Sequence, residues 1–222
     1  MSKVAVDVQY WWDPEPRWPA LLAVLAVVLL YIALPSNLTL RPRWLFPVIV
    51  LMLLVPAVVS HIKQHHLLNR RVGLVLTSVV TAGMIVSVFL LITAIIAHQV
   101  TPTELLRSAA LLWFTNILVF ALWYWRLDAG GPHGRDQRRW HDDGAFLFPQ
   151  MTMPPQAVND VDQKGWSPNF VDYLFLAFNT STAFSPTDVP VLARWAKLVM
   201  MVQSLLSLMI IALLAGRAVN IL

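Results

Sequence analysis

The chemistry-bearing residues that stand out in this sequence are small hydroxyl side chains followed by an acid. They fall within residues 180–188: Thr180, Ser181, Thr182, Ser185, Thr187 and Asp188. Where such a segment lines a water-filled path, its acidic side chain attracts cations. Alternatively, the hydroxyls bond to their own backbone and the segment is a packed plug, with Asp188 capping a turn before Pro190. The sequence alone leaves both interpretations open.

The elements around this cluster predict how it is positioned. The apolar stretch 170–178 before it is too short to cross a bilayer, because spanning takes about 20 residues. The apolar run Trp195–Leu214 after it is long enough. A half-helix, an irregular polar segment and a full helix together indicate a re-entrant loop. Non-helical backbone at membrane depth occurs only where it is buried in protein or lines a wet cavity.

This order resembles the pore region of the tetrameric potassium-channel superfamily, where a pore helix ends in a T-x-T-T-V-G-Y-G-D filter and a last helix follows. Aligned without a gap, Thr180, Thr182 and Asp188 match the two pore-helix threonines and the closing aspartate. The five filter positions become Ala183, Phe184, Ser185, Pro186 and Thr187. The resemblance covers residues 104–222, and DUF1345 membrane proteins look similar in this region too.

The resemblance implies a homotetramer in which each chain supplies one pore loop to a path for monovalent cations. The filter itself departs from the family, because Ser185 and Thr187 replace the two glycines that adopt left-handed backbone. Pro186 between them also lacks an N–H. We therefore expect a filter that is not potassium-selective, with Phe184 as a dewetting ring. The alternative is a non-conducting scaffold, sensor or assembly partner that keeps the pore fold.

The composition is typical of an integral membrane protein. Of 222 residues, 58% are apolar and 13% charged, and the mean hydropathy is +0.64. The chain has no cysteine, which excludes disulfides and thiolate metal sites. The net charge of +4 comes from basic loops, which favours contact with anionic lipid headgroups over nucleic acid. We expect no cofactor and no enzyme activity, since no nucleophile–base pair recurs on one side of the membrane.

The apolar runs predict an all-α polytopic membrane protein with five transmembrane helices plus the re-entrant pore helix and loop. The spanning runs are 18–34, 44–60, 72–97, 105–125 and 193–217, with Pro56 expected to kink or end the second. Three regions follow: an interfacial segment 1–17, for which a disordered tail is the alternative, a three-helix region 18–104, and a pore-like module 105–222. The module holds a hydrophilic loop (128–167), the pore helix and filter-like loop (170–188) and the last helix.

Polar residues on the predicted helices have competing interpretations. Gln203, Ser204 and Ser207 share one side of the last helix. Asn116 at mid-depth predicts a helix–helix hydrogen bond, and the alternative is that it lines a conduction path directly. Trp123, Tyr124 and Trp125 read as an interface anchor. Thr101 and Glu104 around Pro102 predict a helix start with a threonine cap.

Two histidine-containing stretches raise the question of metal binding. His61, His65 and His66 lie on one helical face but lack a nearby carboxylate, so a headgroup-contacting loop is favoured over a metal site. His141-Asp142-Asp143 has no third partner at ligand spacing. We therefore predict no metal centre.

The predicted location is a cell membrane, with the bacterial inner membrane favoured, but two rules conflict on orientation. If the pore loop opens to the outside, as in the channel family, the inside receives only Arg41, Arg43, Arg107 and Arg217. The other twelve of the 16 lysines and arginines then lie outside, against the positive-inside rule. Orientation stays open at this stage.

Overall fold

A computed structural model describes residues 15–63, 65–98, 101–137, 141, 144–153, 166–183 and 188–218. The interfacial interpretation of residues 1–14 and the filter positions Phe184, Ser185, Pro186 and Thr187 lie outside the described residues. The all-α prediction is confirmed for the rest, where the only β contact is a single bridge between Phe146 and Val191.

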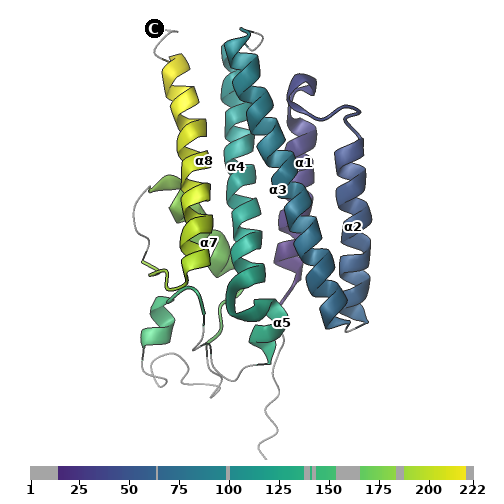
Figure 1. Cartoon of the computed structure of the whole chain (residues 1–222), viewed down its shortest axis with the longest axis vertical. Coiled ribbons are helices and arrows are strands. Elements are labelled where there is room, and N and C mark those ends of the chain that lie inside the picture. The colour runs from purple at the N-terminus through teal and green to yellow at the C-terminus, as the bar shows by residue number, and fades with distance from the viewer. Residues whose placement is uncertain are drawn as a thin grey trace, which may run out of the picture.

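Six longer helices form the body of the part of the chain that the structure describes (Figure 1). They are α1 Trp18–Ala33, α2 Leu45–Ile62, α3 His66–Ile96, α4 Pro102–Leu127, α7 Phe170–Thr182 and α8 Arg194–Ala218. Short pieces connect them: η1 Ser36–Leu38, η2 Asp128–Gly130, α5 Gly131–Asp136 and η3 Pro149–Thr152. In Figure 1, α7 lies beside only the lower half of α8.

Among the described residues, four helical segments are long and apolar enough to cross a membrane: Leu45–Ile62, His66–Ile96, Pro102–Asp136 and Arg194–Ala215. The chain is thus described as a multi-pass membrane protein. Helix α1 is equally apolar but has 16 residues, about 24 Å at 1.5 Å per residue. The hydrocarbon core is about 30 Å thick, so α1 is short for a fifth span.

Helix α4 is the centre of the bundle because it contacts α1, α3, α7 and α8. In an 18-residue apolar stretch of α4, 61% of the residues are buried. The corresponding share in α8, which lies at the periphery, is 17%. Buried small side chains such as Ala109 and Ala121 let neighbouring helices approach α4 closely.

The start of α4 agrees with the signal predicted at Thr101. The end of α2 and the start of α3 differ from the bounds of their predicted apolar runs. Thr101 and Glu104 form a reciprocal capping box with Pro102 in the first turn, as predicted. Helix α2 continues through Pro56 to Ile62, so the proline does not end it. Helix α3 begins at His66, six residues before the apolar run, because its polar first turns lie at the surface and need no apolar face.

Helices α7 and α8 both begin at the same end of the bundle, which we call the foot. Residues 190–192, just before α8, pair at the foot with residues 145–147. The Leu147 N–H donates to the Pro190 carbonyl oxygen at 2.9 Å, and the Leu192 N–H donates to the Ala145 carbonyl oxygen at 2.8 Å. Phe146 and Phe148 are buried beside this pairing. The apolar stretch that holds these two rings therefore packs on the protein at the foot.

The predicted interface anchor is wrong for two of its three residues. Tyr124 and Trp125 are buried, with 0% and 4% exposure, and their polar atoms have partners inside the molecule. Trp123 is half-buried and donates its indole N–H to Thr81 Oγ1 on α3 at 2.8 Å. The side chains face inward because α4 is central, so little of its surface remains for headgroups.

Candidate functional site

A buried hydrogen-bond network joins α4, α7 and α8 about halfway through the bundle. We call it the mid-depth network; its side chains are Trp113, Asn116, Tyr124, Ser181, Gln203 and Ser207. Gln203, fully buried, is its hub. Its amide N–H groups donate to the Ala177 carbonyl oxygen at 2.7 Å and to Ser181 Oγ at 2.8 Å, and its Oε1 accepts from the Tyr124 hydroxyl.

The remaining bonds of the network connect the same three helices. Ser207 Oγ donates to the Ser181 carbonyl oxygen at 2.8 Å and accepts from the Trp113 indole at 3.1 Å. Asn116 Nδ2 lies 3.4 Å from both Ser181 Oγ and the Gln203 carbonyl oxygen. The predicted role of Asn116 in a helix–helix hydrogen bond is therefore confirmed, while its buried Oδ1 has no partner among the described residues.

The network places the end of α7 deep in the bundle. Ser181, in the last turn of α7, bonds to Ser207, which lies near the middle of the 25-residue α8. Helix α7 has 13 residues, a length of about 20 Å. It therefore runs from the foot to roughly the middle of α8 and stops there.

The sequence-predicted residues around this point divide into inward and outward groups. Thr180 is buried and Thr182 exposed, and each donates its hydroxyl to a carbonyl oxygen of its own helix, Leu176 at 2.8 Å and Phe178 at 3.0 Å. Ala183 and Asp188 are exposed. Gln203 and Ser207 point inward, whereas Ser204 is half-buried outside the network, so the three predicted residues do not act together.

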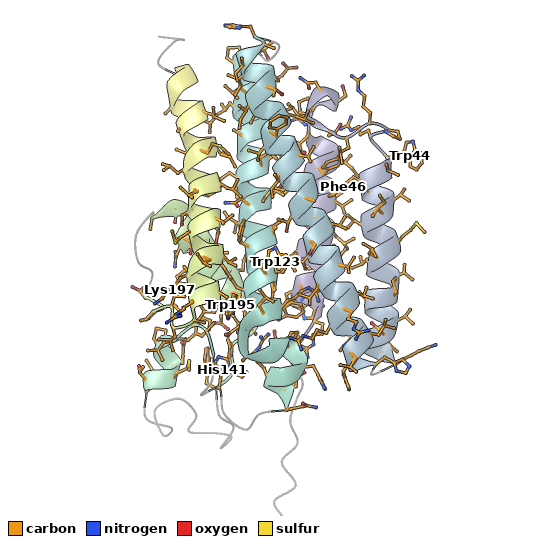
Figure 2. All side chains as sticks on the ribbon, viewed as in Figure 1. Trp44, Phe46, Trp123, His141, Trp195 and Lys197 are labelled. Carbon is orange, nitrogen blue, oxygen red and sulfur yellow. The ribbon has the colours of Figure 1, made fainter. Side chains whose placement is uncertain are left out.

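A second polar centre lies at the foot, around the fully buried carboxylate of Asp128. Its Oδ2 accepts the Tyr173 hydroxyl at 2.6 Å and its Oδ1 accepts the Ala145 N–H. His141 Nε2 lies 3.5 Å from Oδ2. Burial raises the pKa of the Tyr173 phenol, so the phenol remains a donor at neutral pH. Figure 2 shows His141 at the foot, below Trp195 and Lys197 at the start of α8.

An ion-pair chain anchors the lead-in of α1 beside this centre. Arg135 donates to Glu15 Oε2 at 2.8 Å and to the carbonyl oxygens of Trp125 and Asp128 at 2.9 and 3.0 Å. Glu15 also accepts from the Trp125 indole. Arg17 pairs with Glu15 at 3.3 Å and with Asp136. Burial lowers the pKa of Arg17 and the two carboxylates oppose that effect, so it stays charged.

Sequence reasoning missed Asp128, Arg135, Glu15 and Tyr173, which come together from distant positions. The one local signal was a charged residue directly after a spanning helix, followed by Gly130 and Gly131 with positive φ. In the suspected His141-Asp142-Asp143 cluster, His141 faces Asp128 instead, and its two neighbours lie outside the described residues.

The described residues contain no group of three or more histidine, aspartate or glutamate side chains placed to hold a metal ion. His66 instead stacks on His133, with ring centres 3.5 Å apart. The two centres can fix α7 and α1 against α4, and they leave Thr182 and Ala183 at the end of α7 exposed. No family model, curated protein or solved structure matches this chain.

Proposed function

We propose that the chain is one subunit of a homotetrameric membrane pore, in which α7 and residues 183–188 of each copy border a path for cations. The observation that carries the proposal is the depth of α7: it starts at the foot, and the mid-depth network holds its last turn beside the middle of α8. A helix of this length supports a re-entrant arrangement, since it cannot cross the bilayer.

The end of α7 needs enclosure that one chain does not supply. The final carbonyl groups of a helix lack intrahelical partners, and Thr182 and Ala183 are exposed there. Backbone polar groups facing lipid each cost several kcal/mol. Copies arranged around a common axis would enclose these groups and surround a wet path with them.

The residues of the loop favour cations without potassium selectivity. Asp188 is exposed and bears no ion pair among the described residues, so four copies would form an acidic ring. Ser185, Pro186 and Thr187 lack the glycines that a potassium-type carbonyl cage requires. Poor discrimination between sodium and potassium follows from this composition.

A non-conducting scaffold or assembly partner is the second candidate, and one observation favours it. The outward side of α8 is apolar, with Leu198, Met201, Leu205 and Leu208 exposed, while the polar Gln203 and Ser207 point inward. A pore lined by the outward side of α8 would therefore have a hydrophobic wall along that helix. Such a surface suits contact with lipid or another membrane protein equally well.

In this proposal α1 crosses the membrane as a fifth span beside the four longer ones, in a cell membrane such as the bacterial inner membrane. The 16-residue length of α1 is accommodated by local thinning of the bilayer.

The deciding experiment is cation flux through purified full-length protein in liposomes, together with its mass in nanodiscs. The proposal expects a tetramer, and sodium and potassium flux above that of protein-free liposomes. A monomer would contradict the pore, because a single α7 encloses nothing. A folded tetramer without flux, in wild type and in Phe184→Ala, would favour the scaffold instead.

A further inference from the structure

Two arginines and two histidines from four elements converge at the foot, on the side of α3 and α5. The guanidinium carbons of Arg17, before α1, and Arg126, near the end of α4, lie 5.9 and 5.3 Å from the centre of the Trp125 ring. His66 of α3 stacks on His133 of α5 beside them. The described residues thus bring together groups from positions far apart in the sequence.

The nearby carboxylates are committed to other cations. Glu15 accepts from Arg17, Arg135 and the Trp125 indole. Asp136 binds Arg17 and the backbone N–H of Glu15. Arg126 has neither an ion pair nor a hydrogen bond within the described part of the chain.

Arg126 packs closely against α3, and we call the place where this side chain meets α3 the notch. Its guanidinium lies against Gly73 of α3, where an added Cβ would come 1.8 Å from Nη1. Its Nε is buried without a partner. An unpaired guanidinium at the end of a spanning helix is costly, and an anion that binds it removes that cost. The planar fork of donors suits phosphate oxygens in particular.

The surroundings of the notch favour a lipid over a water-soluble anion. Exposed cations lie at the foot ends of α2 and α3, at Lys63, Arg70 and Arg71, none of them ion-paired among the described residues. Large apolar side chains from the same helix ends are exposed as well: Trp18, Ile62, Leu67 and Leu68. A phospholipid places its phosphate on the cations and its acyl chains on these apolar groups.

We propose that the notch between α3 and α4 at the foot, with Arg126 at its base and Arg17 and Arg70 at its rim, binds the phosphate of an anionic phospholipid headgroup. The lipid phosphate supplies the anionic partner that the described residues do not give Arg126. This site is independent of conduction and would exist in either candidate function.

The test uses full-length protein in nanodiscs of phosphatidylcholine, with and without phosphatidylglycerol, read by thermal unfolding and by native mass spectrometry of retained lipid. The test variant is Arg126→Gln. The matched control is Arg107→Gln, the same substitution at an exposed arginine near the opposite end of α4. Arg70→Gln is a second, exposed test variant that leaves the core untouched, and inorganic phosphate at matched ionic strength is the soluble probe.

We expect phosphatidylglycerol to stabilise wild type and Arg107→Gln and to be retained in preference to phosphatidylcholine. Losing one such cation should lower that preference about fivefold in Arg126→Gln, with a smaller loss in Arg70→Gln. Equal lipid preference in all variants would overturn the site. Stabilisation by inorganic phosphate as large as that by phosphatidylglycerol would overturn the assignment to lipid and indicate a soluble phosphate ligand.

Discussion

The side-chain amide of Gln203 in α8 donates to the carbonyl oxygen of Ala177 in α7 at 2.7 Å, inside the bundle and away from any open surface. A carbonyl at this position in α7 lies in the last turns of the helix, so the bond fixes how far α7 enters. The depth of Thr182 and Ala183 at the end of α7 therefore depends on this contact.

Replacing Gln203 with leucine should therefore loosen α7. The change leaves the Tyr124 hydroxyl without its partner and removes one hydrogen bond each from the Ala177 carbonyl and from Ser181 Oγ, which keeps Asn116 Nδ2. We expect a loss of about 2–3 kcal/mol, because the one buried group left unsatisfied costs about 1–3 kcal/mol and the two lost hydrogen bonds add to it. Unfolding in detergent, followed by tryptophan fluorescence, measures it. Ser204→Ala, one residue away and outside the network, is the control; equal stability of the two variants would contradict the role of Gln203.

The Tyr173–Asp128 bond should show strong coupling in a double-mutant cycle of Tyr173→Phe and Asp128→Asn. The carboxylate is fully buried and accepts the phenol at 2.6 Å. A hydrogen bond to a charged group contributes about 1.5–3 kcal/mol, which is the coupling expected in the free energy of unfolding. Tyr173→Phe combined with Ser204→Ala should instead be additive. Additivity in both cycles would show that the bond contributes nothing net.

The sequence predicted what local patterns encode and missed what tertiary docking decides. Apolar runs located the four described helices that are long and apolar enough to cross a membrane, and the Thr101 cap was found because its partners lie three residues apart. Asp128 and Tyr173 are 45 residues apart, and Glu15 and Arg135 are 120 apart. Nothing in either neighbourhood indicates the other, because these contacts follow from the packing of α4, α5 and α7 at one end of the bundle.

The same reason explains why the aromatic triplet at 123–125 was misread. Tryptophan and tyrosine at a helix end favour the headgroup level when the helix is peripheral. Helix α4 is central, so Tyr124 reaches Gln203 and Trp125 reaches Glu15 instead. Predicting this requires knowing which helix is surrounded by the others, and a hydropathy pattern does not carry that information.

Gly83→Ala should weaken the packing of α2 on α3. A Cβ at position 83 would lie 2.2 Å from Cε2 of Phe46, a buried ring that also contacts Tyr31 with ring centres 4.2 Å apart. Overpacking of this kind costs about 1–3 kcal/mol. Thermal unfolding of Gly83→Ala against Ser78→Ala, on the exposed side of α3, measures it. A variant as stable as the control would mean that Phe46 moves aside freely.

Orientation can be read from single cysteines, because the chain has none of its own. Gln137 lies at the foot after α5, and Ser36 follows α1 at the other end of the bundle. The described cations concentrate at the foot, so the positive-inside rule predicts that the foot faces the cytoplasm. Gln137→Cys should then react with an impermeant reagent only after permeabilisation, and Ser36→Cys in intact cells. The reverse pattern would support the channel-family geometry; labelling of both in intact cells would contradict the arrangement of the helices.

Selectivity tests the proposed pore most directly, because its two chemical elements make separate predictions. An acidic ring at Asp188 raises the local concentration of cations, so Asp188→Asn should lower the preference for cations over anions. Asp188 is exposed and takes no part in the mid-depth network, so the substitution should leave folding and assembly unchanged. Reversal potentials under bi-ionic gradients in planar bilayers measure both this preference and the ratio of potassium to sodium permeability.

We expect the ratio of potassium to sodium permeability to be close to one, because Pro186 and the absence of glycine at 185 and 187 disfavour a carbonyl cage. Phe184→Ala should raise the leak if the four rings form a dewetting constriction. Strong potassium selectivity in wild type would instead require these residues to adopt the cage backbone, and our interpretation of the filter would be wrong.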